Sequence, residues 1–470
     1  MDSFTFTLQP HGGKPMYEQI YEYIAGEMRA GRLRAGEKLP SRRALAAHLR
    51  VSQNTVDTAY GMLAAEGYLR AVPKSGFYAC ALERLSVQPA GAEPEPAQDA
   101  PASPPGRDRF LYDFRTDTVD TSIFPYTTWA KLSREVIAGG DSLLNRGDPQ
   151  GDPPLRRAIA KYLHEFRGVN CSADQIIVGA GLEYLIGLTA QLLRGMGKIA
   201  LENPGYERTR RIIRNCGGDT VCLPLDRAGL RADSLPGDGV CAAYITPSHQ
   251  FPTGVVMPIG RRMELLAWAC RAPGRYIIED DYDSEFRYAG RPIPALQGLD
   301  QHGRVIYLST FSKCIAPSIR VAYLVLPQDL LIQYRRVFGA YSSTVSRFEQ
   351  QTLARFLSEG HFGRHLNRTR LLYRRQRSQL IQSLTGIGLP FEILGGNAGV
   401  HFAMRVKNGM AEHELVQRAA DCGVRVYGLS EYCMVPVEDL PRSTAVLGYA
   451  GFSAADFQRA AALLKQAWMP

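Results

Sequence analysis

The stretch between about Leu82 and Arg109 divides this chain into two folding units. Its centre reads AGAEPEPAQDAPASPPGRDR, which is rich in Pro, Ala and acidic residues and nearly free of aromatic side chains. A segment of this composition cannot bury enough apolar surface to offset the entropy that a chain loses on folding. We therefore predict a flexible linker at 82–109, a small head at 11–81 and a large body at 110–470.

The composition is that of a folded protein in a reducing compartment. At 470 residues the chain is too long for one ordinary domain, and 45% hydrophobic with 21% charged residues is the usual mix for a soluble protein. There is no basic start followed by an apolar run, and no run of about 18 apolar residues, so we expect neither a signal peptide nor a membrane span. The nine cysteines form no CxxC pair, which favours reduced thiols over disulfides or a zinc site. We expect a cytoplasmic protein without a metal.

The head has the pattern of three helices followed by a hairpin. The first helix begins at Pro15 and carries one apolar stripe, formed by Met16, Ile20, Tyr23, Ile24 and Met28. Ser41 is a good N-cap for a helix to about Arg50, and after a tight turn another helix runs from Asn54 to Glu66. Two short strands are expected around Pro73–Gly76. This order predicts a winged helix-turn-helix, a fold that reads DNA.

The charge of the head is compatible with DNA binding. The whole chain carries a mild formal charge of +9, and residues 11–80 hold ten Lys and Arg against six Asp and Glu. A recognition helix enters the major groove by its N-terminus, where Gln and Asn can pair with adenine and Arg with phosphate or guanine. The residues expected at these helix starts and at the wing are Arg43, Ser52, Gln53, Asn54, Thr55, Lys74 and Gly76. The alternative is a helical hairpin used for protein contacts.

The body alternates strand-like apolar runs with helical stretches. The expected buried strands are 175–180, 198–202, 240–246, 276–280, 304–310 and 321–327. Strands that alternate with helices predict an α/β domain with a largely parallel sheet, whose ligand site lies beyond the carboxyl ends of the strands.

Polar residues follow these strand ends. Asp280 ends one strand, with Tyr282 two residues later, and Lys313 lies just past another. Tyr206 lies on a loop after a third, and VGAGLEYL (178–185) is a Gly-rich turn that leads into a helix. Each feature is ordinary by itself. Together they match the needs of pyridoxal 5′-phosphate: a lysine for the Schiff base, a carboxylate for the pyridine nitrogen, an aromatic face and an anion cradle with a cation.

Both halves resemble known families. The motifs PMYEQIYEYI, GEKLPSRRALAAHL, VSQNTVDTAY, LAAEGYL and KSGF cover the head and resemble the GntR family of bacterial winged-helix regulators. From about residue 112 to the C-terminus the body resembles a fold-type I aminotransferase, and the combination resembles the MocR subfamily of GntR regulators. The resemblance implies a mostly parallel sheet with a smaller C-terminal subdomain, and a PLP-dependent regulator that forms a domain-swapped homodimer on a double-stranded DNA operator.

The resemblance also implies roles for individual residues. Lys313 resembles the Schiff-base lysine, Asp280 the partner of the pyridine nitrogen, and Tyr282 the donor to the ring O3′. Tyr206 resembles the aromatic residue that stacks on the ring, and Arg208 a position near the effector. The remaining cofactor contacts implied are the backbone groups of Ala180, Gly181 and Leu182 and the side chains of Thr310, Ser312 and Arg320.

The chain departs from aminotransferases at several positions. Phe251 stands before Pro-Thr-Gly where aminotransferases have the Asn that bonds O3′, which leaves His249 or Gln250 for that role. Val446 replaces the arginine that clamps a substrate carboxylate, and Glu431 stands where some MocR relatives carry an arginine. Where relatives have a Tyr that reaches the neighbouring subunit's phosphate, this chain has Arg146, which is either a substitute cation or a surface residue.

In the head, Gln53 stands where many relatives have Arg, so the operator sequence does not follow from the relatives. We expect a regulator that senses an amine, an amino acid or PLP itself, with Arg208, Glu431 and Arg146 as candidate effector contacts. The alternative is an active aminotransferase that carries a DNA-binding domain, since Lys313 and Asp280 are both present.

Overall fold

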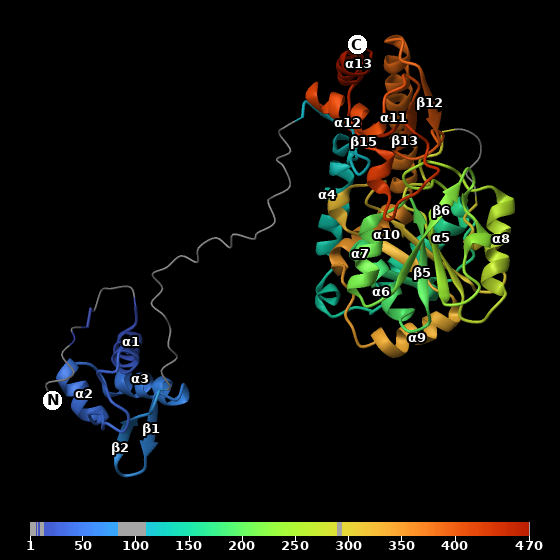
Figure 1. Ribbon diagram of the computed structural model, residues 1–470. Coiled ribbons are helices and arrows are strands. Elements are labelled where there is room, and N and C mark those ends of the chain that lie inside the picture. The colour runs from blue at the N-terminus through green and yellow to red at the C-terminus, as the bar shows by residue number, and fades with distance from the viewer. Residues whose placement is uncertain (1–5, 7, 10–13, 83–109, 289–293, 470) are drawn as a thin grey trace. The chain divides into compact units, whose positions relative to one another are not determined.

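The computed structural model describes residues 6, 8–9, 14–82, 110–288 and 294–469, and the chain falls into two compact units, one up to Pro104 and one from Pro105 onward (Figure 1). The predicted linker at 82–109 lies, apart from its first residue, outside the described residues.

The head is built from three helices and a two-stranded hairpin. Its elements are α1 (Met16–Arg29), α2 (Arg42–Leu49), α3 (Gln53–Ala65), β1 (Leu69–Val72) and β2 (Gly76–Ala79). Ser41 caps α2, since its hydroxyl accepts a hydrogen bond from the backbone N–H of Ala44 at 3.2 Å. The head has its own core, which includes Ile20 and Ile24 of α1 and Val56 and Leu63 of α3. The predicted order of elements is confirmed.

The two short strands expected around Pro73–Gly76 are present: Pro73–Ser75 form the turn, and β1 and β2 pair antiparallel on either side of it. Lys74 takes a left-handed conformation there, with φ of 62°, so the chain reverses at this point. Met16 is 36% exposed because the buried stripe of α1 begins one turn later, at Ile20.

The body is organised around an eight-stranded sheet in the order β4-β11-β10-β9-β8-β5-β6-β7. Its strands are β4 (Ile176–Gly179), β5 (Lys198–Asn203), β6 (Thr220–Asp226), β7 (Gly229–Leu230), β8 (Val240–Ile245), β9 (Tyr276–Asp280), β10 (Val305–Thr310) and β11 (Ala322–Val325). Neighbours from β10 through β9, β8 and β5 to β6 are parallel, whereas β11 and β7 are antiparallel to theirs. All six predicted strands are present, and the mostly parallel sheet is confirmed.

Helices cover both faces of this sheet. Alternate residues of the central strands pack on opposite sides, so that Ile199 and Leu201 of β5 contact a core with α6 and α9, while Ala200 joins a core with α8. The helices of the body are α4 (Tyr126–Ile137), α5 (Pro153–Arg167), α6 (Leu182–Leu192), α7 (Glu207–Asn215), α8 (Ile259–Cys270), α9 (Gln328–Phe338), α10 (Arg347–Ser358), α11 (His361–Gly386), α12 (Glu412–Asp421) and α13 (Ala454–Trp468).

A smaller C-terminal subdomain completes the body at the end away from α9 (Figure 1). Its sheet has the order β12-β13-β16-β15, with β12 (Phe391–Leu394), β13 (His401–Val406), β15 (Tyr427–Gly428) and β16 (Thr444–Gly448). β14 (Val424–Arg425) pairs with β3 (Tyr112–Asp113), so the start of the body is tied to this subdomain. Among the described residues, no helix combines the length and the apolar character needed to cross a membrane.

Candidate functional site

The carboxyl ends of the parallel strands bring the predicted residues to one edge of the large sheet. Asp280 is the last residue of β9, and Thr310 is the last residue of the neighbouring β10, three residues before Lys313. The turn that follows β8 carries His249, and the loop that follows β5 carries Tyr206. Because these strands are parallel and adjacent, the loops that follow them form one continuous site.

Asp280 is a buried carboxylate with one oxygen unused. The Tyr244 hydroxyl donates a short hydrogen bond to its Oδ2, while Oδ1 has no hydrogen-bond partner among the described residues. Burial raises the pKa of Asp280 to about 7, and the carboxylates of Asp281 and Asp283 add to that rise. The free oxygen can therefore accept a hydrogen bond from a protonated nitrogen.

Lys313 presents an amine in a desolvated position. Its Nζ donates a hydrogen bond to the carbonyl of Thr116 at 3.1 Å. Burial lowers the pKa of Lys313, an effect that Asp283 and Asp117 oppose and Arg208 reinforces. A lysine with a lowered pKa carries more of the neutral, nucleophilic amine.

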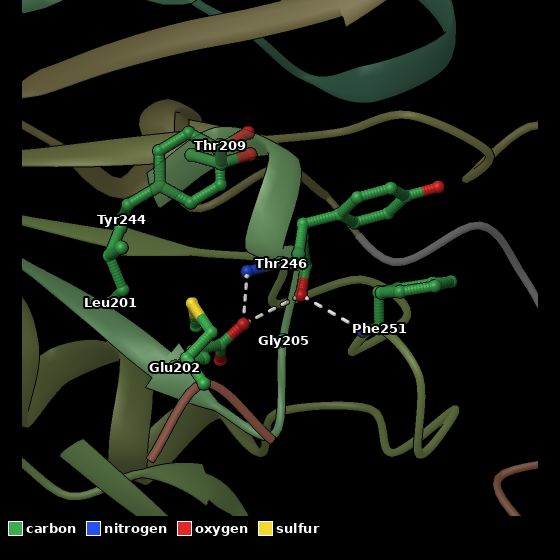
Figure 2. A pocket seen from close by; sticks show the side chains of 9 residues that line it. Leu201, Glu202, Gly205, Thr209, Tyr244, Thr246 and Phe251 are labelled. Carbon is green, nitrogen blue, oxygen red and sulfur yellow. Dashed lines mark hydrogen bonds between the residues drawn. The ribbon is translucent and has the colours of Figure 1, made fainter. Parts of the chain in front are cut away.

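Tyr206 supplies an aromatic face, part of which is already covered. Its ring stacks on Phe251 with centroids 3.9 Å apart. Both rings line a small cavity, in which Glu202 accepts hydrogen bonds from the backbone N–H and the hydroxyl of Thr246 at 3.0 and 2.7 Å (Figure 2). With a volume near 10 Å³ this cavity has room for a single water at most. Because Phe251 covers one face of the Tyr206 ring, a larger ligand that stacks on this ring must use the other face.

The turn before α6 has the properties of an anion cradle. α6 begins at Leu182 with Gly181 as its N-cap, and no side chain caps the first N–H groups. Gly181 has φ of 95°, and a Cβ there would collide with the guanidinium of Arg320. Arg320 in turn forms an ion pair with Glu183 at 2.6 Å. The uncapped helix start and this cation can together hold a phosphate.

Three other predicted cradle residues already have partners in the protein. The N–H of Ala180 donates to the hydroxyl of Thr344 at 3.0 Å. The Thr310 hydroxyl donates to that of Ser312 at 3.0 Å and accepts from the Ser312 N–H at 3.1 Å. Thr310 and Ser312 thus shape the turn that carries Lys313.

The turn without the usual Asn is held together by Gln250 and leaves His249 beside Tyr282. The Gln250 amide accepts from the N–H and hydroxyl of Thr253 and donates to the carbonyls of Pro204 and Phe251, so it is used within the turn. The Tyr282 hydroxyl donates to the carbonyl of His249 at 3.0 Å and lies 3.2 Å from its Nδ1. Of the two residues considered for the role of the Asn, only His249 contacts Tyr282.

The three predicted effector residues are placed differently. Arg208 is exposed, its guanidinium lies 3.4 Å from Glu183, and its charge acts on both Tyr206 and Lys313. Glu431 is exposed and accepts from the N–H of Gly428 at 2.7 Å, so it stabilises its own short turn. Arg146 is exposed and donates to the Ser342 hydroxyl at 2.8 Å.

Val446, which we expect at the position of a carboxylate-binding arginine, lies inside the sheet of the C-terminal subdomain. Val446 is fully buried in β16, where it pairs with Ala403 of β13 and Tyr427 of β15. An apolar side chain there offers a carboxylate no hydrogen bond.

Sequence reasoning missed two groups of the site. Tyr244 lies inside the apolar run of β8, and its phenol was the only polar signal there. Asp283 and His401 form a buried cluster with His249, but they come from segments far apart in the sequence and no spacing rule connects them.

In the head, the predicted DNA contacts divide into exposed and structural side chains. Arg43, Gln53 and Asn54 are exposed around the starts of α2 and α3, and Lys74 is exposed in the hairpin turn. The Ser52 hydroxyl caps α3 by accepting from the N–H of Thr55 at 3.2 Å, and the two hydroxyls lie 2.8 Å apart. Gly76 begins β2 with φ of 117°, a conformation that favours glycine.

Comparisons with known proteins match both units. The family model described as bacterial regulatory proteins, gntR family, matches residues 16–79, and the model described as aminotransferase class I and II matches residues 116–461. The solved structure of a multiple substrate aminotransferase from Thermococcus profundus superposes with a TM-score of 0.66 at 24% identity, and covers 77% of this chain and 91% of that one. The body therefore has the fold-type I aminotransferase architecture.

Relatives with both units are named as regulators. The chain is 39% identical over 464 residues to the uncharacterized HTH-type transcriptional regulator YdeL of Bacillus subtilis (strain 168), with 97% of each chain covered. It is 36% identical to the probable rhizopine catabolism regulatory protein MocR of Rhizobium meliloti, with 93% of this chain and 90% of that one covered.

Proposed function

This chain belongs to the MocR-type GntR-family transcription regulators, and from that premise we propose that its body binds pyridoxal 5′-phosphate and senses a small amine, an amino acid or that cofactor itself. The observation that carries the proposal is the pairing of two groups at the ends of adjacent strands: the unused, buried oxygen of Asp280 and the desolvated amine of Lys313. We further propose that the protein acts in the cytoplasm.

The residues present fit this cofactor. When bound, it supplies an aldehyde that bonds to an amine and a ring that accepts electrons. Asp280 can hold a proton at the ring nitrogen, because its Oδ1 is buried and unpartnered in the described residues. Tyr206 offers a flat face, and the start of α6 with Arg320 offers a place for the phosphate, for which Arg320 would turn from Glu183.

The protein's own groups favour sensing over efficient turnover. Lys313 supplies the nucleophile. The hydrogen bond from the Tyr244 hydroxyl holds the Asp280 carboxylate in place. Binding of an α-amino acid would normally be directed by an arginine, but Val446 and Glu431 stand at the two positions considered for one. Arg208 remains as a cation near the site, so an effector with a distant anionic group or none fits better than an ordinary α-amino acid.

The second candidate is a working aminotransferase, which the intact Lys313 and Asp280 allow chemically. Steady-state assays with common amino donors separate the two functions. Turnover above roughly 1 s⁻¹ lies in the usual enzyme range and would favour the enzyme.

On the DNA side, we propose that the exposed residues Arg43, Gln53, Asn54 and Lys74 contact a double-stranded operator, with α3 in the major groove. We also propose a domain-swapped homodimer, so that two heads read paired half-sites. Large exposed apolar side chains on the body support a second copy as the occupant: Tyr126 is 68%, Ile137 65% and Leu144 73% exposed, on α4 and on the short helix at Asp141–Leu144, both of which pack on α10.

Lys313→Ala tests the cofactor site. We expect the purified variant, after incubation with pyridoxal phosphate, to lack the yellow absorbance of the wild type while it still binds operator DNA through its head. Lys161→Ala is the matched control, because Lys161 is an exposed lysine on α5. An unchanged absorbance spectrum in Lys313→Ala would refute the assignment.

A further inference from the structure

Three buried side chains converge at the junction between the large sheet and the C-terminal subdomain. We call them the His-Asp cluster: His249 follows β8, Asp283 follows β9, and His401 begins β13. Each is at most 1% exposed, and one nitrogen or oxygen from each lies within 4.8 Å of the others. The two imidazole centroids are 4.7 Å apart, and His249 Nδ1 lies 2.9 Å from Asp283 Oδ2.

The cluster holds more hydrogen-bonding capacity than the protein uses. His249 Nε2 and Asp283 Oδ1 have no hydrogen-bond partner among the described residues, and the two ring nitrogens of His401 have at most the Pro252 carbonyl between them. Burying polar atoms without partners costs free energy, on the order of 1–3 kcal/mol for each group. Unpartnered atoms on all three side chains in one place indicate that a further group satisfies them.

The buried carboxylate of the cluster favours a cation as the missing partner. The buried guanidinium groups of the region bond elsewhere: Arg167 pairs with Asp281 at 2.8 Å, and Arg262 donates to backbone carbonyls. Among the described residues no guanidinium pairs with the Asp283 carboxylate, and the Lys313 amine, whose charge acts on it, donates its hydrogen bond to the Thr116 carbonyl instead.

We propose that His249, Asp283 and His401 bind a divalent transition-metal ion of the zinc, cobalt or nickel class. Two imidazoles and one carboxylate are ligands that these ions prefer, whereas calcium and magnesium take sets made of oxygen alone. Metal–ligand bonds of roughly 2.1 Å in a tetrahedral site place ligand atoms about 3.4 Å apart. Since the ligand atoms of the cluster lie within 4.8 Å of one another, side-chain movements of roughly an ångström complete the site.

The backbone around the cluster is shaped for close approach. Gly399, with φ of 72°, lies so near that a Cβ there would collide with the His249 ring and with Asp283 Oδ2. Its carbonyl accepts hydrogen bonds from the hydroxyls of Tyr449 at 2.6 Å and Tyr288 at 2.5 Å. Because His401 belongs to the C-terminal subdomain and the other two ligands belong to loops of the large sheet, a bound ion would join these parts next to Tyr282.

Cobalt titration of the full-length, chelator-treated and cofactor-free protein tests the site. We expect visible d–d absorption that saturates at about one Co²⁺ per chain and is displaced by Zn²⁺. Asp283→Asn and His401→Leu should each weaken binding at least tenfold, whereas His302→Leu, which changes an exposed histidine, should bind as the wild type does. Lys313→Ala should bind the ion at least as tightly as the wild type, which separates this proposal from the cofactor proposal.

Two results overturn the proposal: no saturable Co²⁺ or Zn²⁺ binding, or equal affinity in the wild type and both cluster variants. If the variants do not fold, X-ray absorption of the zinc-loaded wild type decides. Nitrogen and oxygen neighbours with an imidazole pattern support the cluster. Sulfur neighbours would place the ion on some of the nine cysteines and refute it.

Discussion

At the scale of single residues, the edge of the large sheet concentrates buried acid groups. Glu202, Glu279, Asp280 and Glu285 are all buried, and desolvation is the first cause that raises the pKa of each to about 7. Arg167 is engaged by Asp281, so it cannot neutralise all of them. The charged form of these carboxyl groups is therefore unfavourable in the empty site. A bound cation, such as a protonated ring nitrogen, would stabilise that negative charge.

This arrangement predicts that the cofactor-free body loses stability as the pH rises from about 4 to 7. The unfolded chain ionises a carboxyl near pH 4, whereas folded Asp280 does so near 7, so the unfolded chain binds fewer protons in between and the free energy of unfolding falls. Three pH units correspond to about 4 kcal/mol for one such group. Urea unfolding followed by tryptophan fluorescence measures it, because Trp129, Trp268 and Trp468 all lie in the body.

Asp280→Asn should make that pH dependence shallower, because the amide does not ionise. Saturating pyridoxal phosphate should do the same in the wild type, because a protonated nitrogen keeps Asp280 charged. A pH dependence that is unaffected by both changes would contradict the buried-acid account.

The sequence predicted which residues of the candidate site follow strands. It did not predict the hydrogen-bond partners that hold those residues. Lys313, Asp280 and Tyr206 could be found because strand ends of a parallel sheet meet at one edge. Tyr244 was hidden inside an apolar strand, and the engagement of Gln250 within its turn depends on a backbone path that no residue pattern specifies. Hydrogen-bond partners such as Thr344 for Ala180 come from segments that are distant in the sequence, so no local pattern predicts them.

At the scale of elements, the turn from β4 into α6 depends on one glycine. Gly181→Ala should raise the dissociation constant for pyridoxal phosphate at least tenfold, because φ of 95° strains alanine and the new Cβ would displace Arg320. An absorbance titration measures the affinity. Gly260→Ala is the control, since a Cβ at that helical position meets nothing within 4 Å. Equal affinities for the two variants would argue against the cradle.

The start of α3 depends on Ser52 in the same way. Ser52→Ala should destabilise the head by about 1 kcal/mol, because the N–H of Thr55 loses its acceptor. Hydrogen exchange of the α3 amides in the full-length protein should become faster, with a matching loss of operator affinity, while Ser52→Thr should retain most of the protection. Unchanged exchange in Ser52→Ala would show that the cap is dispensable.

Elements were predictable where apolar periodicity was strong and less so where turns set the geometry. Val56, Ala59, Tyr60 and Leu63 of α3 recur at three- and four-residue spacing, and all four are buried. β6 and β7 were missed: β6 lies near the sheet edge, contains Pro224 and is only partly buried, so it lacks a continuous apolar run. The hairpin of the wing could be placed because Pro73 and Gly76 mark the turn and its exit.

At the scale of the whole molecule, the division into head and body could be predicted because composition alone decides which segment lacks a core. The separate cores of the two units agree with that division. Composition does not determine how the units communicate. A regulator requires only a few kcal/mol of coupling between effector and DNA, and in a homodimer that coupling can act through the spacing of two heads.

The proposed dimer interface on the body can be tested by substitution. Ile137→Glu and Leu144→Glu place charges on apolar side chains that are 65% and 73% exposed, so a buried dimer interface there would be broken by desolvation of the carboxylates. We expect the double variant to sediment as a monomer and to lose at least a hundredfold in affinity for a two-half-site operator, because each head then binds alone. Ile259→Glu on α8 is the matched control, since Ile259 is 61% exposed on a different helix. Affinity for a single half-site should be unchanged in both variants, because the head is intact. A double variant that stays dimeric would move the interface elsewhere, and a monomer with full operator affinity would show that DNA recognition needs only one head.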